Sequence, residues 1–299
     1  MSFDPTSLGL NGWIDSPRRY PVARSLRYPV FAQAAPYLMG TDQDVFLYRA
    51  WKDVIGNYPN YKAQTIGDCV SQGAGHAIDL LQCVEIAIGR EAECYKELST
   101  EAIYGLSREI AGMLGDWQDG CFGSAAAKAY TDHGVVPREI VGEYDGKRAK
   151  NWGYHGVPAE IRAECAKHKG RAASKVATCE EADAALGNGY PITVASNQGF
   201  TMTRNADGVC RPQGQWMHQM ASVARRKRAG KRQYLIIQSW GPNVPDGPLT
   251  DDQPDFSFWI DDATFARMLA QQDSFAFSAF DGFPGRPLPS AWTNEGWIG

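Results

Sequence analysis

The spacing of hydrophobic residues changes along the chain. In the first half, after residue 60, apolar positions recur at helical spacing in the segment 74–89 and again in 99–113, where Ile103, Leu106 and Ile110 fall on one stripe. This period is typical of amphipathic helices that bury one face. After residue 190 the chain consists of short apolar runs, some of them alternating, which favours strands. The sequence therefore predicts helices first and strands afterwards.

Prolines, glycines and capping residues indicate where the other elements begin and end. Pro158 suits the first position of a helix, and Thr178 with Glu181 forms a capping box. Further helices are expected near 42–55 and at 125–131, 158–169, 178–187 and 263–271. Strands are expected at 190–195, 218–223, 233–238 and 256–260, followed by a closing strand and turn within 273–284. We predict an α+β fold with two lobes that face each other across a cleft.

Residues 1–60 differ from the rest of the chain. They are rich in Pro, Tyr and Arg and show little periodicity apart from the short helix near 42–55. We interpret them as an extended N-terminal arm. Three roles remain open for it: an interaction arm that docks on a partner, a small inhibitory segment, or an extension wrapped around the first lobe.

Composition places the chain among globular proteins of one large or two small domains. It has 299 residues, of which 43% are hydrophobic and 21% charged, and its net charge of −4 gives no reason to expect a nucleic-acid partner. A basic cluster at 225–228 and 231–232 flanks Ala229-Gly230, which we expect to be a solvated hairpin turn. No apolar run is long enough to span a bilayer, and the first thirty residues lack a signal-peptide core.

The cysteines and histidines show no framework or metal spacing. The seven cysteines form an odd set without Cys-x-x-Cys pairs, which favours reduced thiols, and we expect neither a metal nor a cofactor.

Candidate chemistry begins in the stretch 64–73. Cys69 opens the helix that continues through 74–89, and a helix N-terminus stabilises a thiolate. Cys69 is therefore a candidate nucleophile. Gln64, five residues upstream, would supply a side-chain amide beside the Cys69 N–H, which makes two donors for an oxyanion. Further along, His218 lies at the mouth of an alternating segment, and the strand 234–241 ends with Gln238, Ser239 and Trp240.

Cysteine, histidine and amide in this order resemble the papain-like cysteine peptidases. His218 follows Cys69 by 218 − 69 = 149 residues, within the roughly 130–150 typical of that fold. The resemblance implies a helical left lobe at about 61–175 and a right lobe of antiparallel sheet or barrel at about 176–285, followed by a C-terminal tail, so that 61–299 form the catalytic domain. It also implies that Cys69 attacks a peptide carbonyl, His218 transfers protons, Gln238 orients His218, and Trp240 shields that hydrogen bond.

The loop 119–124 resembles the glycine loop on which the family's substrates lie on the non-primed side. Gly123 matches the first of its paired glycines and Ser124 replaces the second, so Gly123, Ser124 and Trp240 are the expected substrate-binding residues. Ile66 occupies the place of a disulfide cysteine of the secreted relatives, which leaves Cys121 without that partner.

The catalytic stretches depart from the family pattern at three positions. Gln238 replaces an asparagine, the spacing from Gln64 to Cys69 is one residue shorter, and Val70 stands where an aromatic residue is usual. These departures leave open the direction in which the side-chain amides of Gln64 and Gln238 point.

The segment after residue 256 looks like papain-like proteins encoded by tailed bacteriophages. The sequence thus predicts a thiol peptidase that acts on peptide or protein substrates and is cytoplasmic or virion-associated. The alternative is a catalytically silent structural or adaptor protein of a phage particle, whose arm contacts neighbouring structural proteins. Peptidoglycan amidase chemistry fits less well, because compact Cys-His lysins place the two residues much closer in sequence.

Overall fold

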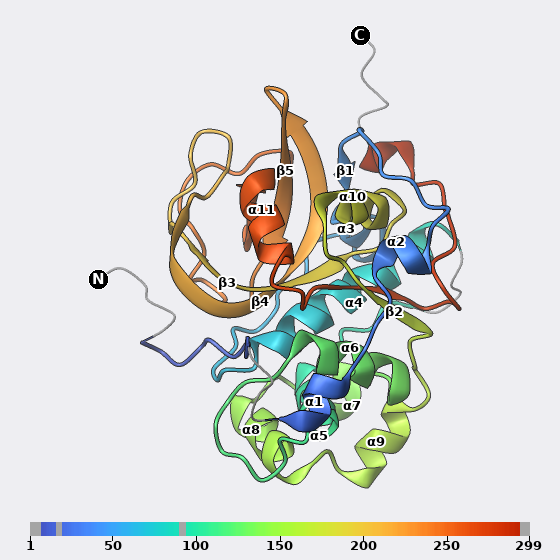
Figure 1. Ribbon diagram of the computed structural model, residues 1–299, viewed down its shortest axis with the longest axis vertical. Coiled ribbons are helices and arrows are strands. Elements are labelled where there is room, and N and C mark those ends of the chain that lie inside the picture. Colours follow the sequence, from blue (N-terminus) through green and yellow to red (C-terminus); the bar gives the residue numbers. More distant parts are fainter. Residues whose placement is uncertain (1–6, 16–19, 90–93, 294–299) are drawn as a thin grey trace.

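The computed structural model describes residues 7–15, 20–89 and 94–293. Two lobes, one of helices and one built on a sheet, pack on either side of a central helix, α4 (Cys69–Ala87) (Figure 1). Nearly all of α4 is buried, because it contacts the helical lobe on one side and strand β4 on the other. Within the described ranges no helix is long and apolar enough to cross a membrane.

The helical lobe contains five helices after α4. They are α5 (Thr100–Ile110), α6 (Gly123–Asp132), α7 (Arg138–Val141), α8 (Gly146–His155) and α9 (Ala159–Cys165). Helix α5 begins where the Ser99 hydroxyl accepts a hydrogen bond from the Ala102 N–H. Its apolar stripe is buried against α6 and α8, as the helical spacing predicts. Helix α8 was not expected from the sequence, because its polar residues show no apolar stripe.

The second lobe is built on one antiparallel sheet. Its strands are β1 (Val45–Phe46), β2 (Ala172–Lys175), β3 (Ile192–Phe200), β4 (Pro212–Arg228), β5 (Lys231–Ile237), β6 (Ser257–Asp261) and β7 (Phe275–Ser278). They follow the order β2-β7-β3-β4-β5-β6, and β1 pairs with β4. Helices α10 (Cys179–Gly187) and α11 (Asp262–Leu269) pack against this sheet. The α+β class expected from the sequence is confirmed.

The arm does not extend away from the body between residues 20 and 60. It forms α1 (Pro21–Ser25), α2 (Phe31–Ala34) and α3 (Arg49–Ile55), and Phe31 and Trp51 are buried in the core. Its main chain bonds to β2, where the Lys175 N–H donates to the Pro29 carbonyl at 3.0 Å. The helix expected near 42–55 begins only at Arg49, because residues 45–46 pair with β4 instead. Residues 20–60 are therefore folded onto the body, and they contact the sheet lobe through β1 and Phe31.

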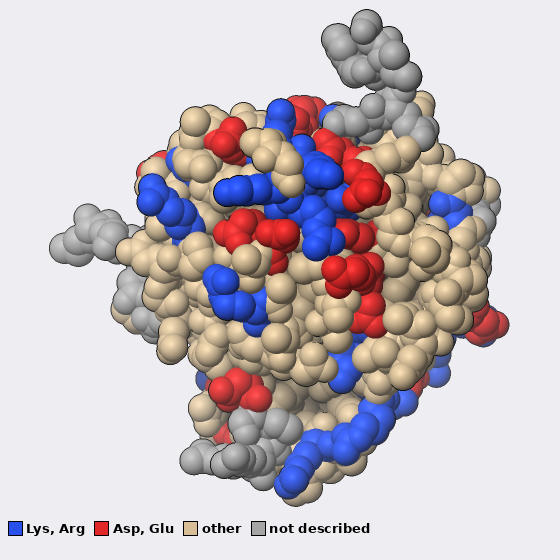
Figure 2. All heavy atoms as spheres, turned by 45° about the horizontal axis from the view of Figure 1, so that its top comes forward, with Lys and Arg blue, Asp and Glu red and all other residues tan. Residues whose placement is uncertain are grey.

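The basic cluster lies at the end of the β4–β5 hairpin. Ala229 and Gly230 form the exposed turn that the sequence predicts. Arg225 and Arg226, however, are fully buried, and they form ion pairs with Asp183 and Asp251. Figure 2 shows Lys and Arg side chains interspersed with Asp and Glu over this face. The cluster is thus a set of compensated charges, and the expectation of a wholly solvated turn was wrong for its two buried arginines.

A buried ion pair fastens the C-terminal tail to α4. The Arg286 guanidinium pairs with Glu85 and donates to the carbonyls of Asn188 and Gly189 at 2.7 and 3.1 Å. It also lies 3.9 Å from the centroid of the Tyr190 ring. Within the described residues, the tail then forms a short 3₁₀ helix, η2 (Ser290–Trp292), whose tryptophan is buried.

We expect Arg286→Ala to lower the free energy of unfolding by about 3–5 kcal/mol, because it leaves Glu85 buried without its cation. Urea unfolding of the purified protein measures this. Arg211→Ala, at an exposed arginine, is the matched control and should change stability by less than about 0.5 kcal/mol. The double variant Glu85→Gln/Arg286→Met should recover part of the loss; a single variant as stable as the wild type would contradict the assignment.

Candidate active site

Cys69 is the first residue of α4, as predicted, and its sulfur contacts the opposite lobe. The side chain is completely buried. Sγ accepts a hydrogen bond from the Gln219 N–H at 3.4 Å and lies 3.9 Å from the Met217 carbonyl oxygen. The thiol thus lies against the main chain of β4 on both sides of His218.

His218 lies on β4 opposite Ser196 of β3. Its ring packs on Trp240 with a centroid separation of 4.4 Å, and Trp216 contacts the same indole at 4.9 Å. Trp240 therefore covers one face of the His218 ring. Neither ring nitrogen of His218 has a hydrogen-bond partner in the described part of the chain. The two catalytic candidates are neighbours through the β4 backbone, but no hydrogen bond joins their side chains.

Gln238 does not form the hydrogen bond expected with His218. Its Nε2 donates to the Asn243 carbonyl at 2.7 Å, while its buried Oε1 has no partner among the described residues. The turn after Trp240 brings that carbonyl within reach, since the Asn243 N–H bonds back to the Trp240 carbonyl at 3.2 Å. The amide is therefore held by the turn instead of by the imidazole.

Gln64 is held firmly, and its amide points at another part of the chain. Its Oε1 accepts from the Ser239 hydroxyl, and its Nε2 donates to the carbonyls of Leu10 and Ile66, each at 2.8 Å. The donor that the sequence assigns to an oxyanion is thus occupied by the carbonyl of Leu10.

Residues 10–14 pass between the two lobes beside the N-terminus of α4 (Figure 1), next to the candidate nucleophile. The Trp13 N–H donates to the Met217 carbonyl at 3.0 Å. On the other side, the Cys121 N–H donates to the Gly12 carbonyl at 2.8 Å, and the Ile14 N–H donates to the Cys121 carbonyl at 3.0 Å. The segment is therefore bound through its main chain to both lobes, in the manner of an extended peptide ligand.

The direction of this segment is opposite to that of a substrate. A peptide with its non-primed residues on the 120–124 loop and its scissile carbonyl at Gln64 would run from the loop toward Gln64. Residues 10–14 begin at Gln64 and end at the loop, and Trp13 pairs with Cys121 as a parallel bridge. The segment fills the cleft without presenting a peptide bond in the orientation for attack.

The segment approaches the body most closely at Gly12. A Cβ atom at this position would lie 1.8 Å from the Gly67 carbonyl oxygen, far inside van der Waals contact. From the other side, a Cβ at Gly67 would lie 2.9 Å from the Asn11 carbonyl oxygen. Only glycine at position 12 allows this approach, because the obstacle is backbone and cannot rotate away.

Burial keeps both catalytic candidates neutral. It raises the pKa of the Cys69 thiol to about 12, and the backbone N–H groups of Gln219, Gly12 and Trp13 only partly oppose this. Burial, with a smaller contribution from His76, lowers the pKa of His218 to about 3. A thiolate–imidazolium pair therefore does not form at neutral pH while the cleft is filled.

Gly123 and Ser124 lie at the start of α6, and their N–H groups are engaged. Both donate to the carboxylate of Asp273, at 2.7 and 2.8 Å, and the Trp13 indole donates to the same group at 2.8 Å. The residue that pairs with the peptide in the cleft is Cys121, two positions before Gly123. The loop expected to bind substrate thus contacts residues 12–14 through Cys121, while Asp273 accepts the N–H groups of Gly123 and Ser124.

Sequence reasoning did not identify Trp13, Cys121 or Asp273 as residues of the site. Gly9 and Gly12, two glycines within an arm otherwise rich in proline, were the available signal for a close backbone approach. Cys121 was considered only as half of a lost disulfide, and all seven cysteines, each within the described ranges, are unpaired. For Asp273 the sequence carries no local signal.

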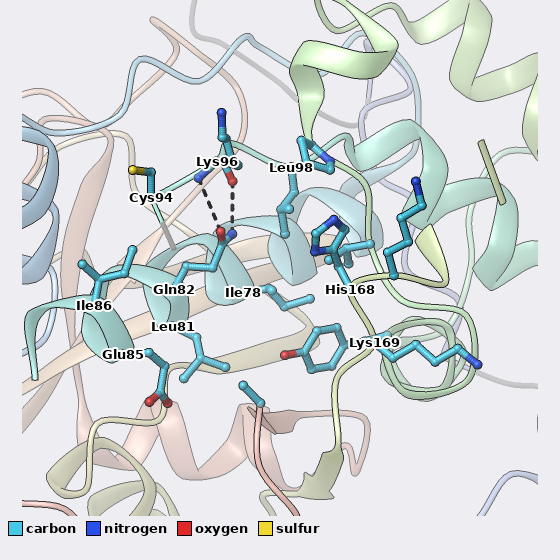
Figure 3. Close-up of a pocket in the computed structure, with 15 residues that line it drawn as sticks. Ile78, Leu81, Gln82, Glu85, Ile86, Cys94, Lys96, Leu98, His168 and Lys169 are labelled. Carbon is cyan, nitrogen blue, oxygen red and sulfur yellow. Dashed lines mark hydrogen bonds between the residues drawn. The ribbon is translucent and has the colours of Figure 1, made fainter. Parts of the chain in front are cut away.

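A second hollow, of about 280 Å³, lies away from the cleft, between the C-terminal half of α4 and the helical lobe (Figure 3). Its floor is apolar, with Ile78, Leu81 and Leu98, and Lys169 and Cys94 lie at its rim. It contains none of the candidate catalytic residues. Across the described ranges no group of three or more His, Cys, Asp or Glu side chains could hold a metal ion.

Comparison with known proteins identifies the fold. No protein-family model and no curated protein matches the sequence. Xylellain, a cysteine protease from Xylella fastidiosa, has a TM-score of 0.60 at 17% identity, covering 91% of this chain and 97% of its own. Procathepsin B S9 from Trypanosoma congolense has a TM-score of 0.58 at 11% identity, covering 93% and 89%. The Amb a 11 cysteine protease of ragweed pollen, in its proform, has a TM-score of 0.61 at 14% sequence identity. The match covers 94% of this chain and 71% of that protein. The chain has the papain-like cysteine protease fold, as expected.

We expect Cys69 to resist alkylation by iodoacetamide at pH 7–9, since its thiol is buried with a pKa raised to about 12. Exposed Cys94 is the internal reference. In Gly12→Ala, which cannot fit against Gly67, Cys69 should react at least about tenfold faster, while the rate at Cys94 stays the same. Mass spectrometry of the separate peptides measures both rates. Equal Cys69 rates in the two proteins would show that residues 10–14 do not cover the thiol.

Asp68, directly before the candidate nucleophile, makes stability depend on pH. Burial, with nearby Glu101, raises the pKa of its carboxyl to about 7, although Gln72 and Tyr144 donate to Oδ2 at 3.0 Å each. A raised folded-state pKa means that the native state binds the proton more tightly than the unfolded chain. This stability is therefore present below about pH 4 and is lost as the pH rises through about 7.

We expect Asp68→Asn to remove the loss of stability that accompanies a rise in pH toward 7. The stability difference between pH 5 and pH 8, from urea unfolding, should be smaller in the variant than in the wild type by roughly 1.4 kcal/mol for each pH unit between 5 and 7, where the native state holds the proton and the unfolded chain does not. Asp281→Asn, at an exposed carboxyl, should leave the difference unchanged. An Asp68→Asn profile parallel to that of the wild type would contradict the assignment.

Proposed function

We propose that this protein is a thiol peptidase that is latent while residues 10–14 occupy its cleft. One observation carries the proposal. An extended peptide, the protein's own segment, already lies across the Cys69 sulfur with its main chain bonded to Met217 and Cys121. The cleft thus offers an extended peptide main-chain partners from both lobes. That is the recognition a peptidase needs before chemistry begins.

The residues around the thiol support hydrolysis through an acyl-enzyme. Once the cleft is open, water reaches Cys69 and His218, and the N-terminus of α4 favours the thiolate. The thiolate attacks the substrate carbonyl carbon, Gln64 Nε2 and the Cys69 N–H bind the oxyanion, and His218 protonates the leaving amine. His218 then takes a proton from water, which attacks the thioester, releases the carboxylic acid and restores the thiol.

Opening requires the segment to leave Gln64, because the same Nε2 donor cannot serve Leu10 and an oxyanion at once. Two similar structures, procathepsin B S9 and the Amb a 11 proform, are themselves precursor forms of proteases. Their likeness supports the latent state that we propose here. In this state the inhibitory segment, one of the three roles left open for the arm, is residues 10–14.

A specific observation favours a second candidate, a catalytically silent scaffold. Gln238 bonds to Asn243 instead of His218, so no side chain among the described residues orients the imidazole. Cysteine proteases need a fixed imidazole tautomer, and its loss lowers the rate without changing the fold. The association with a phage particle, the neighbouring structural partners and the cytoplasmic or virion location are proposals that rest on the sequence resemblance alone.

Hydrolysis of a mixed peptide library by Gly12→Ala and by Trp13→Ala tests the two candidates. We expect both variants to cleave peptides faster than the wild type, because each weakens the bound segment. Trp117→Ala, at an exposed tryptophan outside the cleft, is the control and should match the wild type. Adding His218→Ala to Gly12→Ala should reduce the rate by about 10²–10⁴-fold. An open variant whose Cys69 alkylates rapidly but which cleaves no peptide would establish the scaffold.

A further inference from the structure

We infer that Asn11 is a deamidation site, and that its slow conversion to aspartate and isoaspartate prevents residues 10–14 from returning to the cleft. The inference rests on the latency proposed above and goes beyond it, because it names a covalent change that ends the latent state. Asn11 is followed by Gly12, and the chain has one other Asn-Gly pair, Asn188-Gly189. Asparagine loses its side-chain ammonia most readily before glycine, because glycine has no side chain to hinder attack by its nitrogen.

The packing of the segment requires this reactive pair to be present. A Cβ atom at Gly12 would lie 1.8 Å from the Gly67 carbonyl oxygen, so no other residue at position 12 allows the segment to bind as it does. The glycine that lets the segment bind therefore also leaves its own nitrogen unhindered. The Asn11 side chain is not held through its oxygen, because Oδ1 is buried and has no hydrogen-bond partner among the described residues.

The reaction needs no reagent other than water. The Gly12 backbone nitrogen attacks Cγ of Asn11, the bond from Cγ to the amide nitrogen breaks, and ammonia leaves with the proton of the Gly12 N–H. The product is a five-membered succinimide ring, and water then adds to one of its two carbonyl carbons. Breaking the ring bond between nitrogen and Cγ gives aspartate, whereas breaking the bond between nitrogen and the main-chain carbon gives isoaspartate. In total, one water is consumed and one ammonia is released.

The bound segment is protected from this reaction. Attack requires the Asn11 main chain and side chain to rotate until the Gly12 nitrogen faces Cγ. The contacts on both sides oppose that rotation, since the Leu10 carbonyl accepts from Gln64 Nε2 and the Gly12 carbonyl accepts from the Cys121 N–H, each at 2.8 Å. Asn11 therefore deamidates in molecules whose segment has left the cleft, and the observed rate is proportional to the open fraction.

Neither product fits the cleft as the asparagine does. Aspartate would place a carboxylate oxygen where Oδ1 of Asn11 is buried without a donor, and burying an unpaired charge is costly. Isoaspartate adds one methylene group to the main chain between the bonded carbonyls of Leu10 and Gly12. The hydrogen bonds on the two sides of residue 11 then no longer match their partners together. Each opening thus carries a chance of a change after which the segment cannot close.

The second Asn-Gly pair is an internal control, because its contacts hold both reacting groups. The Gly189 N–H donates to the Leu186 carbonyl at 3.0 Å, and Asn188 Nδ2 donates to the Ala184 carbonyl at 2.9 Å. The Arg286 guanidinium also bonds the carbonyls of Asn188 and Gly189, at 2.7 and 3.1 Å. This pair does not belong to the segment, so opening of the cleft should leave it unchanged.

Ageing of the purified full-length protein at pH 8 in water labelled with ¹⁸O tests the reaction. Deamidation during ageing incorporates the label, and mass spectrometry of the separate peptides follows Asn11 and Asn188 in the same sample. We expect Asn11 to deamidate faster than Asn188 in the wild type. In Trp13→Ala, which weakens the bound segment and keeps the Asn-Gly pair, deamidation of Asn11 should be at least about tenfold faster, with Asn188 unchanged. Isoaspartyl methyltransferase labelling identifies the isoaspartate product.

The consequence for the cleft is measured on the deamidated protein itself. Its additional negative charge allows separation from the unmodified protein by anion exchange. We expect iodoacetamide to label Cys69 at least about tenfold faster in the deamidated fraction, with the rate at exposed Cys94 equal in the two. In Asn11→Ser, which cannot form a succinimide, the Cys69 rate should stay constant during ageing.

Two results would overturn the inference. One is deamidation of Asn11 that is no faster than that of Asn188 in Trp13→Ala. The other is a deamidated fraction whose Cys69 reacts no faster than in the unmodified protein. Rapid labelling of Cys69 in the unaged wild type would instead refute the proposed latency, because the segment would then not cover the thiol. Failure to hydrolyse peptides would count against the peptidase alone, since none of these measurements requires hydrolysis.

Discussion

The open edge of strand β4 at residues 217–219 is the constraint on which the site depends. Pairing with β5 begins only at Ala221, so the main-chain groups of Met217 and Gln219 on that edge need other partners. The Cys69 sulfur and the Trp13 N–H supply them. An unpaired strand edge binds extended chains readily. The same edge therefore positions the thiol and provides the place where a peptide lies, and the two functions cannot be separated in this fold.

Local rules predicted the parts of the molecule whose structure is decided locally. The start of α4 at Cys69, the Ser99 cap of α5 and the capping box of α10 depend on neighbouring residues, and the sequence predicted them within a few positions. The α+β class also followed, because the hydrophobic period changes along the chain. Even the order of the candidate catalytic residues was sufficient to indicate the family fold.

Contacts between distant residues were not predictable in the same way. The first half of the helix expected at 42–55 does not form, because residues 45–46 pair with β4 as a short strand. Local sequence preferences do not predict this pairing. Gln238 occupies the strand position expected of the residue that orients His218. Its amide instead donates to the carbonyl of Asn243, in the turn three residues beyond Trp240. Trp13 and Asp273 are 260 residues apart, and only the folded chain brings them together. The resemblance named candidate catalytic positions but gave no indication of the segment that lies against them.

The reversed direction of residues 10–14 would determine how long the proposed latent state can last. A segment bound like a substrate would be consumed by the nucleophile beneath it, and latency would end at the rate of that reaction. This segment offers no bond to break, so its residence depends on thermal release alone. Because it is tethered, it returns at an effective concentration on the order of millimolar, which any competing peptide must exceed or outbind. A competing peptide would then occupy the cleft only above a threshold set by its concentration and affinity. Closure would be reversible for as long as the chain stays whole.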